Sequence, residues 1–421
     1  MDMPPSRRRF SASSSPQARS GLLPPDLLRL CGIVLALAWL VLLGADGWNH
    51  TRHGVVDGKG EQLGRDFVYA WAAPRLAEQG QAASVYSARD FNAFARNLTA
   101  PDAETKFYPY PPTYLLLTAP VSPLPFLPAY LVWTFGGWCL LAGLLRPFLG
   151  WRSAWIAILA APAVFLNGFS GQNGALTAGL IVGGLILLDR RPLLAGALFG
   201  LLLCAKPQLV LLTPLALLAG GRWRALVAMG LTTLALIVLS LLAFGASPWA
   251  AFVHDLPALK RLPDIALNWR RMPTLYSGLR LLGAPAFIAY GVQALSAGLA
   301  AVCVLLVWRG PEATLTKGAV LLLAGFACTP YAWDYDTIPL IFAAAWLWKS
   351  SPETAGVPWE KLLLSALLAA PGLIFIPILA IVVQHVQFAP WLVLALLIIR
   401  GTKALRTHSV PLGWKLGGRN Q

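Results

Sequence analysis

The sequence predicts an all-α, polytopic membrane protein. Hydrophobic residues make up 57% of the 421 residues and charged residues only 12%, about half the charged share of a soluble protein. Apolar runs of about 18 residues or more recur along the chain, and runs of this length cross a bilayer as helices. Examples are residues 225–244, 287–308 and 362–383. The formal net charge of +15 is spread over many short loops, so it does not indicate a nucleic-acid-binding protein.

The two ends of the chain differ from the rest. Residues 1–26 are rich in Ser, Pro and Arg, and we expect them to form a disordered cytoplasmic tail. The first apolar stretch, about residues 27–45, is long for a cleavable signal, so it predicts a retained helix. Residues 27–400 then form one transmembrane domain, and residues 401–421 form a second cytoplasmic tail.

The distribution of basic residues predicts the topology, because short cytoplasmic loops collect Lys and Arg. Short loops near residues 146–152, 189–191, 222–224 and 309–317 each carry two basic residues, whereas the short loops between them carry at most one. The alternation gives about twelve crossings with both termini inside. Two long segments, about residues 46–112 and 246–283, then lie outside, and we expect amphipathic helices in them at the membrane surface.

Polar segments suited to chemistry fall at the helix ends that this topology places outside the cytoplasm. They are residues 64–67, 108–112, 167–174, 206–208 and 329–336. These segments lie far apart in the sequence, yet all fall on the same side of the membrane. Their common side predicts one extracytoplasmic site built on a membrane scaffold. The helices beside Lys206, about residues 193–205 and 209–219, are short and would stop partway, which leaves room for a cavity.

Asp66 begins an aromatic stretch, and the pattern of residues 66–86 predicts an amphipathic helix on the membrane surface. Two interpretations of the carboxylate are open. It can act as a general base that deprotonates an acceptor hydroxyl, or it can cap the helix that follows.

Lys206 is a lone cation between two short apolar helices. A charge in such a place is costly and marks a functional site by default. Its compact ammonium can hold a phosphate, with Gln208 beside it. The alternative is a lysine that extends to the membrane interface.

Tyr108 and Tyr110 stand in a proline-rich segment that cannot form regular helix. They can stack on a sugar or an isoprenoid chain, or they can form a rigid helix start with interfacial tyrosines. Gln172 and Asn173 carry amides suited to sugar hydroxyls, or they form a tight turn.

Tyr331, Asp334 and Asp336 offer a sugar platform with carboxylates for hydroxyl groups or for a divalent metal. The alternative is a capped helix start in an aromatic belt. In the second long loop, His254 and Arg270 are among several basic residues that can meet lipid headgroups or a lipid-linked phosphate. The cysteines lie in or beside apolar runs and the histidines do not cluster, so no disulfide framework or metal site is expected.

The order and spacing of these motifs resemble family 87 glycosyltransferases, which belong to the GT-C superfamily. The resemblance covers roughly residues 60–350. It rests on Arg65-Asp66-Phe67, Tyr108-Pro109-Tyr110-Pro111-Pro112, Gly171-Gln172-Asn173, Lys206-Pro207-Gln208, Thr329-Pro330-Tyr331 and Asp334-Tyr335-Asp336.

This resemblance implies a GT-C-like fold that transfers a hexose, typically mannose, from a polyprenyl phosphate to a glycolipid or polysaccharide. By the same resemblance Asp66 is the base of one inverting displacement, and Lys206 binds the donor phosphate with Gln208, His254 or Arg270. It implies no cofactor and no divalent metal, because basic side chains can neutralise a monophosphate leaving group.

The remaining expectations concern place and partners. The Ala-, Arg- and Leu-rich composition favours a bacterial inner membrane protein with its site on the periplasmic face and membrane lipids as partners. Three alternatives stay open: a flippase or transporter for lipid-linked sugar, the same fold with arabinofuranose or another sugar, and a non-catalytic scaffold. A transporter favours polar groups near the midplane and an inverted repeat, neither of which the sequence indicates.

Overall fold

The computed structural model describes residues 25–51, 54–57, 59–101, 103 and 107–350. Within these residues every regular element is a helix, and one isolated bridge joins Val56 to Gln62. The predicted tails and the helix predicted over residues 362–383 lie outside the described residues.

Four helices of the described part are long and apolar enough to cross a membrane. They are α1 (Pro25–Thr51), α5 (Phe126–Ala160), α10 (Trp223–Phe244) and α13 (Ala286–Arg309). The runs predicted at residues 225–244 and 287–308 are therefore confirmed as helices. Gly150, with φ 73°, kinks α5 inside the loop predicted near residues 146–152. The count of about twelve crossings stays a prediction.

Shorter helices fill the centre of the molecule. They are α6 (Pro162–Phe169), α7 (Gly174–Leu187), α8 (Pro192–Ala205), α9 (Thr213–Ala219), α14 (Thr314–Cys328) and α15 (Pro339–Ser350). Helices α8 and α10 pack closely, because a Cβ on Gly196 would lie 2.1 Å from the Ala225 carbonyl oxygen. The prediction of short helices on both sides of Lys206 is confirmed.

The first long loop is largely helical. It holds α2 (Phe67–Leu76), η1 (Ala77–Gln81), η2 (Ala82–Tyr86) and α3 (Ala88–Leu98), and it leads into α4 (Thr113–Thr118) and η3 (Ala119–Val121). The single surface helix predicted over residues 66–86 is wrong. Gly80, with φ 77°, interrupts it, and most of α2 is buried. Helix α1 also runs six residues further than predicted, to Thr51.

The second long loop contains α11 (Ser247–Lys260), η5 (Leu262–Asp264), η6 (Ala266–Arg271) and α12 (Leu275–Leu281). Two further turns, η4 (Pro207–Leu209) and η7 (Asp334–Thr337), interrupt the central helices.

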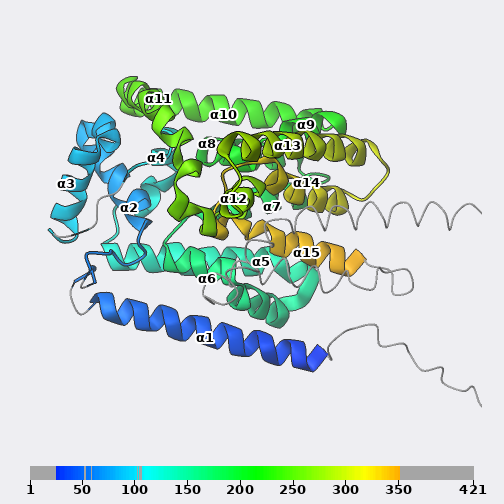
Figure 1. Cartoon of the computed structure of the whole chain (residues 1–421), viewed down its shortest axis with the longest axis horizontal. Coiled ribbons are helices and arrows are strands. Elements are labelled where there is room, and N and C mark those ends of the chain that lie inside the picture. The colour runs from blue at the N-terminus through cyan, green and yellow to red at the C-terminus, as the bar shows by residue number, and fades with distance from the viewer. Residues whose placement is uncertain (1–24, 52–53, 58, 102, 104–106, 351–421) are drawn as a thin grey trace, which may run out of the picture.

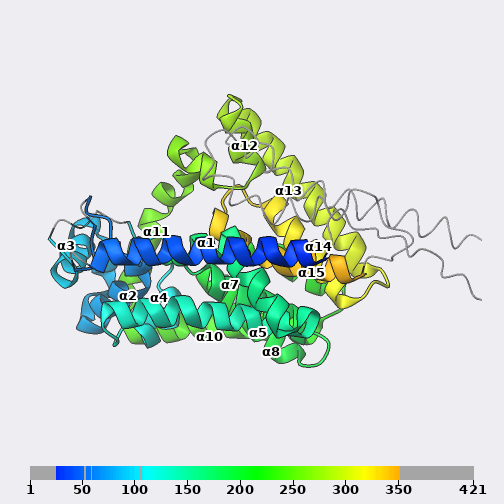
Figure 2. The same cartoon turned by 90° about the horizontal axis from the view of Figure 1, so that it is seen from below.

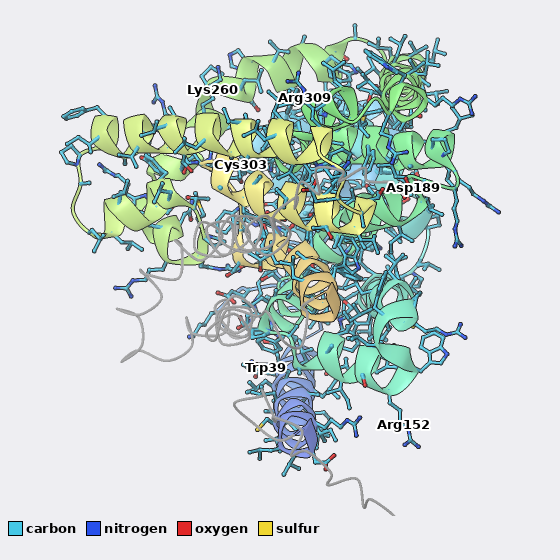
Figure 3. All side chains as sticks on the ribbon, turned by 90° about the vertical axis from the view of Figure 1, so that its right-hand side faces the viewer. Trp39, Arg152, Asp189, Lys260, Cys303 and Arg309 are labelled. Atoms are coloured by element: carbon cyan, nitrogen blue, oxygen red, sulfur yellow. The ribbon has the colours of Figure 1, made fainter. Side chains whose placement is uncertain are left out.

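In Figures 1 and 2, α2, α3 and α11 gather at one end of the molecule, and α1 begins toward the other. Figure 3 views the molecule from that second side and labels Arg152, Asp189 and Arg309, which belong to loops predicted to be cytoplasmic.

Candidate active site

The five polar segments meet in one cluster, as the sequence predicts. Gln172 Nε2 donates to Asp66 Oδ2 over 2.9 Å, and the Tyr110 hydroxyl donates to Gln172 Oε1 over 2.9 Å. Lys206 Nζ lies 2.6 Å from Asp336 Oδ1. These contacts form two groups, and the groups touch, because a Cβ on Gly174 would lie 2.4 Å from the Tyr335 carbonyl oxygen.

Two glycine turns place Asp66. Gly64 and Gly171 both have positive φ, 66° and 59°, which favours glycine. A Cβ on Gly171 would lie 2.4 Å from the Gly64 carbonyl oxygen, so the two turns touch backbone to backbone. The Asp66 amide then donates to the Ser170 carbonyl oxygen over 3.1 Å. The glycines of the motifs therefore bring Asp66 against the loop between α6 and α7.

The side chain of Asp66 is half-buried and turned toward Gln172. Asp66 precedes α2, but its side chain makes no capping hydrogen bond, so the capping interpretation is wrong. Its neighbour Arg65 points elsewhere: the guanidinium pairs with Asp46 of α1 over 2.7 Å and lies 3.6 Å from the centre of the Phe169 ring. Arg65 thus ties α1 to the loop that carries Asp66.

Lys206 and Asp336 form a buried ion pair. Their side chains are 5% and 0% exposed, and the ammonium lies 4.8 Å above the Tyr335 ring. Lys206 therefore does not extend to an interface, and that interpretation is wrong. Asp336 also accepts a hydrogen bond from the Trp333 amide over 3.0 Å, so its predicted capping role and its ion pair occur together.

Arg271, at the end of η6, grips Asp334 with two nitrogens. Nε donates over 2.9 Å and a terminal nitrogen over 3.2 Å, and the same terminal nitrogen lies 3.4 Å from Ser170 Oγ. Burial alone would lower the pKa of Arg271, but the Asp334 carboxylate raises it above the usual value. The guanidinium therefore stays charged. Because 38% of its side chain is exposed, Arg271 lies where the cluster is accessible from outside.

Sequence reasoning missed Arg271 as a member of the site and chose its neighbour Arg270, which is exposed. The signal for Arg271 was only the pair of adjacent arginines, since the two point in different directions from a 3₁₀ turn. His254 has 88% of its side chain exposed and pairs with Asp255. Gln208 is half-buried beside Lys206.

Two of the predicted sugar-binding residues are buried supports. Tyr108 is 1% exposed and packs edge-on against Tyr86 and Tyr110. Asn173, also 1% exposed, donates from Nδ2 to the Tyr114 hydroxyl over 2.9 Å.

Tyr331 lies half-buried at the open side, and its hydroxyl accepts from Trp333 Nε1 over 3.0 Å. Burial raises the pKa of Tyr331 to about 12, so its hydroxyl stays neutral at ordinary pH. Among the described residues, no group of three His, Cys, Asp or Glu side chains could hold a metal ion.

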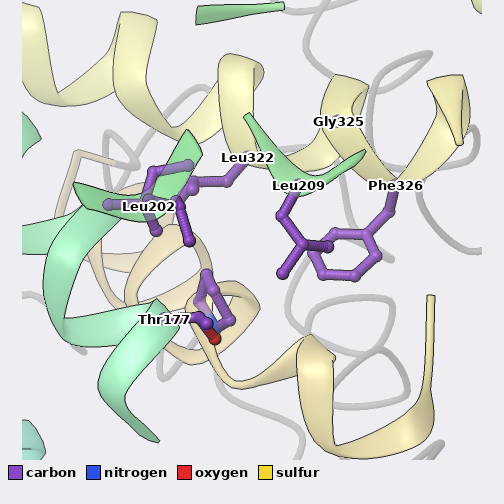
Figure 4. Close-up of a pocket in the computed structure, with 8 residues that line it drawn as sticks. Thr177, Leu202, Leu209, Leu322, Gly325 and Phe326 are labelled. Carbon is purple, nitrogen blue, oxygen red and sulfur yellow. The ribbon is translucent and has the colours of Figure 1, made fainter. Parts of the chain in front are cut away.

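An apolar pocket lies among the short central helices (Figure 4). Its walls come from α7, α8, η4, α14 and α15, with Leu202, Leu209 and Phe326 among the lining residues and Thr177 as a polar one. Leu202 and Leu209 flank Lys206 in the chain, but Lys206 itself does not line the pocket.

Comparison with protein families gives a match to glycosyltransferase family 87 over residues 108–330. The chain belongs to this family. It is therefore a glycosyltransferase with apolar helices long enough to span a membrane. Comparisons with curated proteins and with solved structures give no match. The family match includes Tyr110, Gln172, Lys206 and Arg271, and Asp66 precedes it.

Proposed function

We propose that this family 87 glycosyltransferase moves a hexose, with mannose the first candidate, from a polyprenyl-phosphate donor to a lipid or glycan outside the cytoplasm. The observation that carries the proposal is that Asp66 and Arg271 both contact Ser170. The Asp66 amide donates to the Ser170 carbonyl oxygen, and the Arg271 guanidinium contacts Ser170 Oγ. A half-buried carboxylate and a partly exposed cation therefore belong to the same small region.

This arrangement suits one inverting displacement. The acceptor hydroxyl oxygen attacks the anomeric carbon, and its proton passes to the Asp66 carboxylate. The bond from that carbon to the phosphate oxygen breaks, and its electron pair leaves with the polyprenyl phosphate. A fixed cation near the leaving phosphate stabilises the charge that develops there.

We assign the donor phosphate first to Arg271 and only secondarily to Lys206. Arg271 is partly exposed, and its guanidinium has N–H donors beyond the two that hold Asp334, which can meet a phosphate. Lys206 is buried and already neutralises Asp336, so its charge can act on the donor phosphate only at a distance. In this proposal Gln208, His254 and Arg270 are further contacts of the donor.

A lipid-linked donor reaches its enzyme through the bilayer, which explains why such a site would be built among short helices. Lipid-linked donors also replace nucleotide sugars outside the cytoplasm, which agrees with a bacterial inner membrane protein whose site faces the periplasm.

The test uses the full chain in reconstituted vesicles with radiolabelled polyprenyl-phosphate mannose and a bacterial lipid extract. We expect label to move into a new lipid or glycan, and Asp66→Asn to lower the rate by about a hundredfold or more. Asp90→Asn is the matched control, because Asp90 is an exposed carboxylate of α3 in the same loop.

Two results would contradict the proposal. Label that crosses the bilayer chemically unchanged would indicate a flippase. Equal transfer by wild type and Asp66→Asn would remove Asp66 from the chemistry. Transfer only from another polyprenyl-linked sugar, such as arabinofuranose, would keep the reaction and change the donor.

A further inference from the structure

A directed line of hydrogen bonds ends at Asp66. The line begins at the Tyr110 hydroxyl, which donates to Gln172 Oε1 over 2.9 Å. The Tyr86 hydroxyl holds the Tyr110 backbone, because it donates to the Tyr110 carbonyl oxygen over 2.9 Å. Gln172 Nε2 then donates to Asp66 Oδ2 over 2.9 Å. Tyr86, Tyr110 and Gln172 are all buried, and Asp66 is the accessible end of the line.

The direction of this line follows from the chemistry of its members. Burial raises the pKa of Tyr110 well above its usual value, so the phenol keeps its proton and can donate. A carboxylate only accepts, so the Gln172 amide nitrogen faces Asp66 and the amide oxygen accepts from Tyr110. The Tyr110 hydrogen bond therefore holds the amide in this orientation.

Gln172 cannot easily turn away from this arrangement. Its backbone amide donates to the Asn167 carbonyl oxygen over 3.0 Å, and its carbonyl oxygen accepts from Trp133 Nε1 over 3.0 Å. The Tyr110 ring stacks on Tyr114 with 4.1 Å between ring centroids, which holds the hydroxyl in place. Backbone and side chain of Gln172 are thus both held.

We propose that Gln172 is a positioning residue for Asp66, and that Tyr110 acts through Gln172. The role rests on the proposed function, in which Asp66 is the base. An N–H bond to one carboxylate oxygen fixes the rotamer of the base and favours its charged form. Gln172 and Tyr110 then serve the reaction without touching the sugar.

The kinetic test compares Gln172→Met, Tyr110→Phe and the double variant. Gln172→Met removes the donor at nearly equal volume, and we expect kcat to fall about ten- to a hundredfold with KM for the donor unchanged. The acid limb of the kcat profile should move to higher pH, and further still in Gln172→Glu. Tyr110→Phe should lower kcat less, and the double variant should be no slower than Gln172→Met.

The matched control is Gln293→Met. Gln293 is also buried, but it bonds to the Tyr276 amide and the Ala327 carbonyl oxygen. It should leave the acid limb in place. The inference is overturned if Gln172→Met raises KM without moving the acid limb and if the two substitutions multiply, because those results indicate direct contact with a sugar.

A second measurement separates this inference from the proposed function. Infrared difference titration follows the carboxyl band that disappears in Asp66→Asn, and it needs no turnover. We expect this band to titrate at higher pH in Gln172→Met than in wild type. Equal midpoints would overturn the positioning role even in an active enzyme. A shifted midpoint in a protein that transfers no label would keep the role and refute the proposed reaction.

Discussion

At the scale of single residues, Gly64 and Gly171 allow two turns to touch backbone to backbone. This contact fixes the position of Asp66, whose amide donates to the loop that carries Gly171. Arg65, which directly follows Gly64, has φ 36°, an uncommon conformation for a residue with a Cβ. Strain at this turn is offset by the ion pair of Arg65 with Asp46.

Gly171→Ala should abolish transfer while lowering the melting temperature only modestly. The substitution adds left-handed strain of about 1–2 kcal/mol and a collision with the Gly64 carbonyl oxygen, which must shift Asp66. Gly80→Ala is the control, because Gly80 has φ 77° and open space around its Cβ. Transfer rates and melting temperatures of both variants check this. Equal loss of activity in the two would show that backbone strain alone is responsible.

Lys206→Met should destabilise the protein strongly, by about 3–5 kcal/mol, because it leaves a buried carboxylate unpaired. The fully buried Asp336 has Lys206 as its ion-pair partner. Melting of the detergent-solubilised variant measures the loss. The double variant Lys206→Met with Asp336→Asn should regain part of it, since no unpaired charge remains. A single variant that melts like wild type would mean that the pair contributes nothing to folding.

At the scale of elements, the sequence predicted where the long apolar helices lie. It did not predict which neighbouring elements would cover them. Apolar run length predicted α10 and α13, and the proline after Lys206 predicted the break between α8 and η4. Periodicity failed over residues 66–86, because a pattern shows which face is apolar but not that neighbouring elements also cover the other face. In α2, packing from α3, α4 and η3 buries both.

For the site, the sequence predicted the segments but not the side-chain partners. The residue types and the predicted side of the membrane indicated which segments converge, and the structure confirms that they converge. Partner choice was beyond the sequence: nothing local shows that Gln172 faces Asp66 or that Asp334 takes Arg271 rather than Arg270. Those pairings depend on distances between segments about 60 to 100 residues apart in the chain.

The aromatic cluster around Tyr108 gives a prediction about alkaline pH. Burial raises the pKa of Tyr108 well above its usual value, whereas in the unfolded chain the phenol ionises near about pH 10. Above that pH the unfolded state releases a proton that the folded state keeps, so stability falls as pH rises. Tyr108→Phe should remove this share, about 1.4 kcal/mol per pH unit, measured as melting temperature at pH 8 and pH 11.

At pH 8, Tyr108→Phe should be as stable as wild type or more stable. The Tyr108 hydroxyl is buried and has no hydrogen-bond partner within the described structure, so removing it costs little. Tyr86→Phe is the contrast, because its hydroxyl donates to the Tyr110 carbonyl oxygen and its loss should cost about 1 kcal/mol. If the two variants lost equal stability at pH 8, the Tyr108 hydroxyl would have a partner.

At the scale of the whole molecule, apolar side chains cover the outside and charges gather within and at the ends. Helix α1 exposes Leu30, Val34 and Val41 and buries only 6% of its most apolar window. Such a helix is stable in this place only if lipid covers it. Figure 2 shows α1 running across one face of the molecule, with the loop of α2 and α3 at its far end.

The same arrangement predicts which ends face the cytoplasm. Arg89, exposed on α3, belongs to the loop predicted outside, and Glu312, exposed between α13 and α14, belongs to a loop predicted inside. In a variant without native cysteines, Arg89→Cys should react with a membrane-impermeant thiol reagent in intact cells. Glu312→Cys should react only after the membrane is opened. If both sites were labelled from the same side, the predicted topology would be wrong. The cluster around Asp66 would then lose its predicted access to extracytoplasmic acceptors.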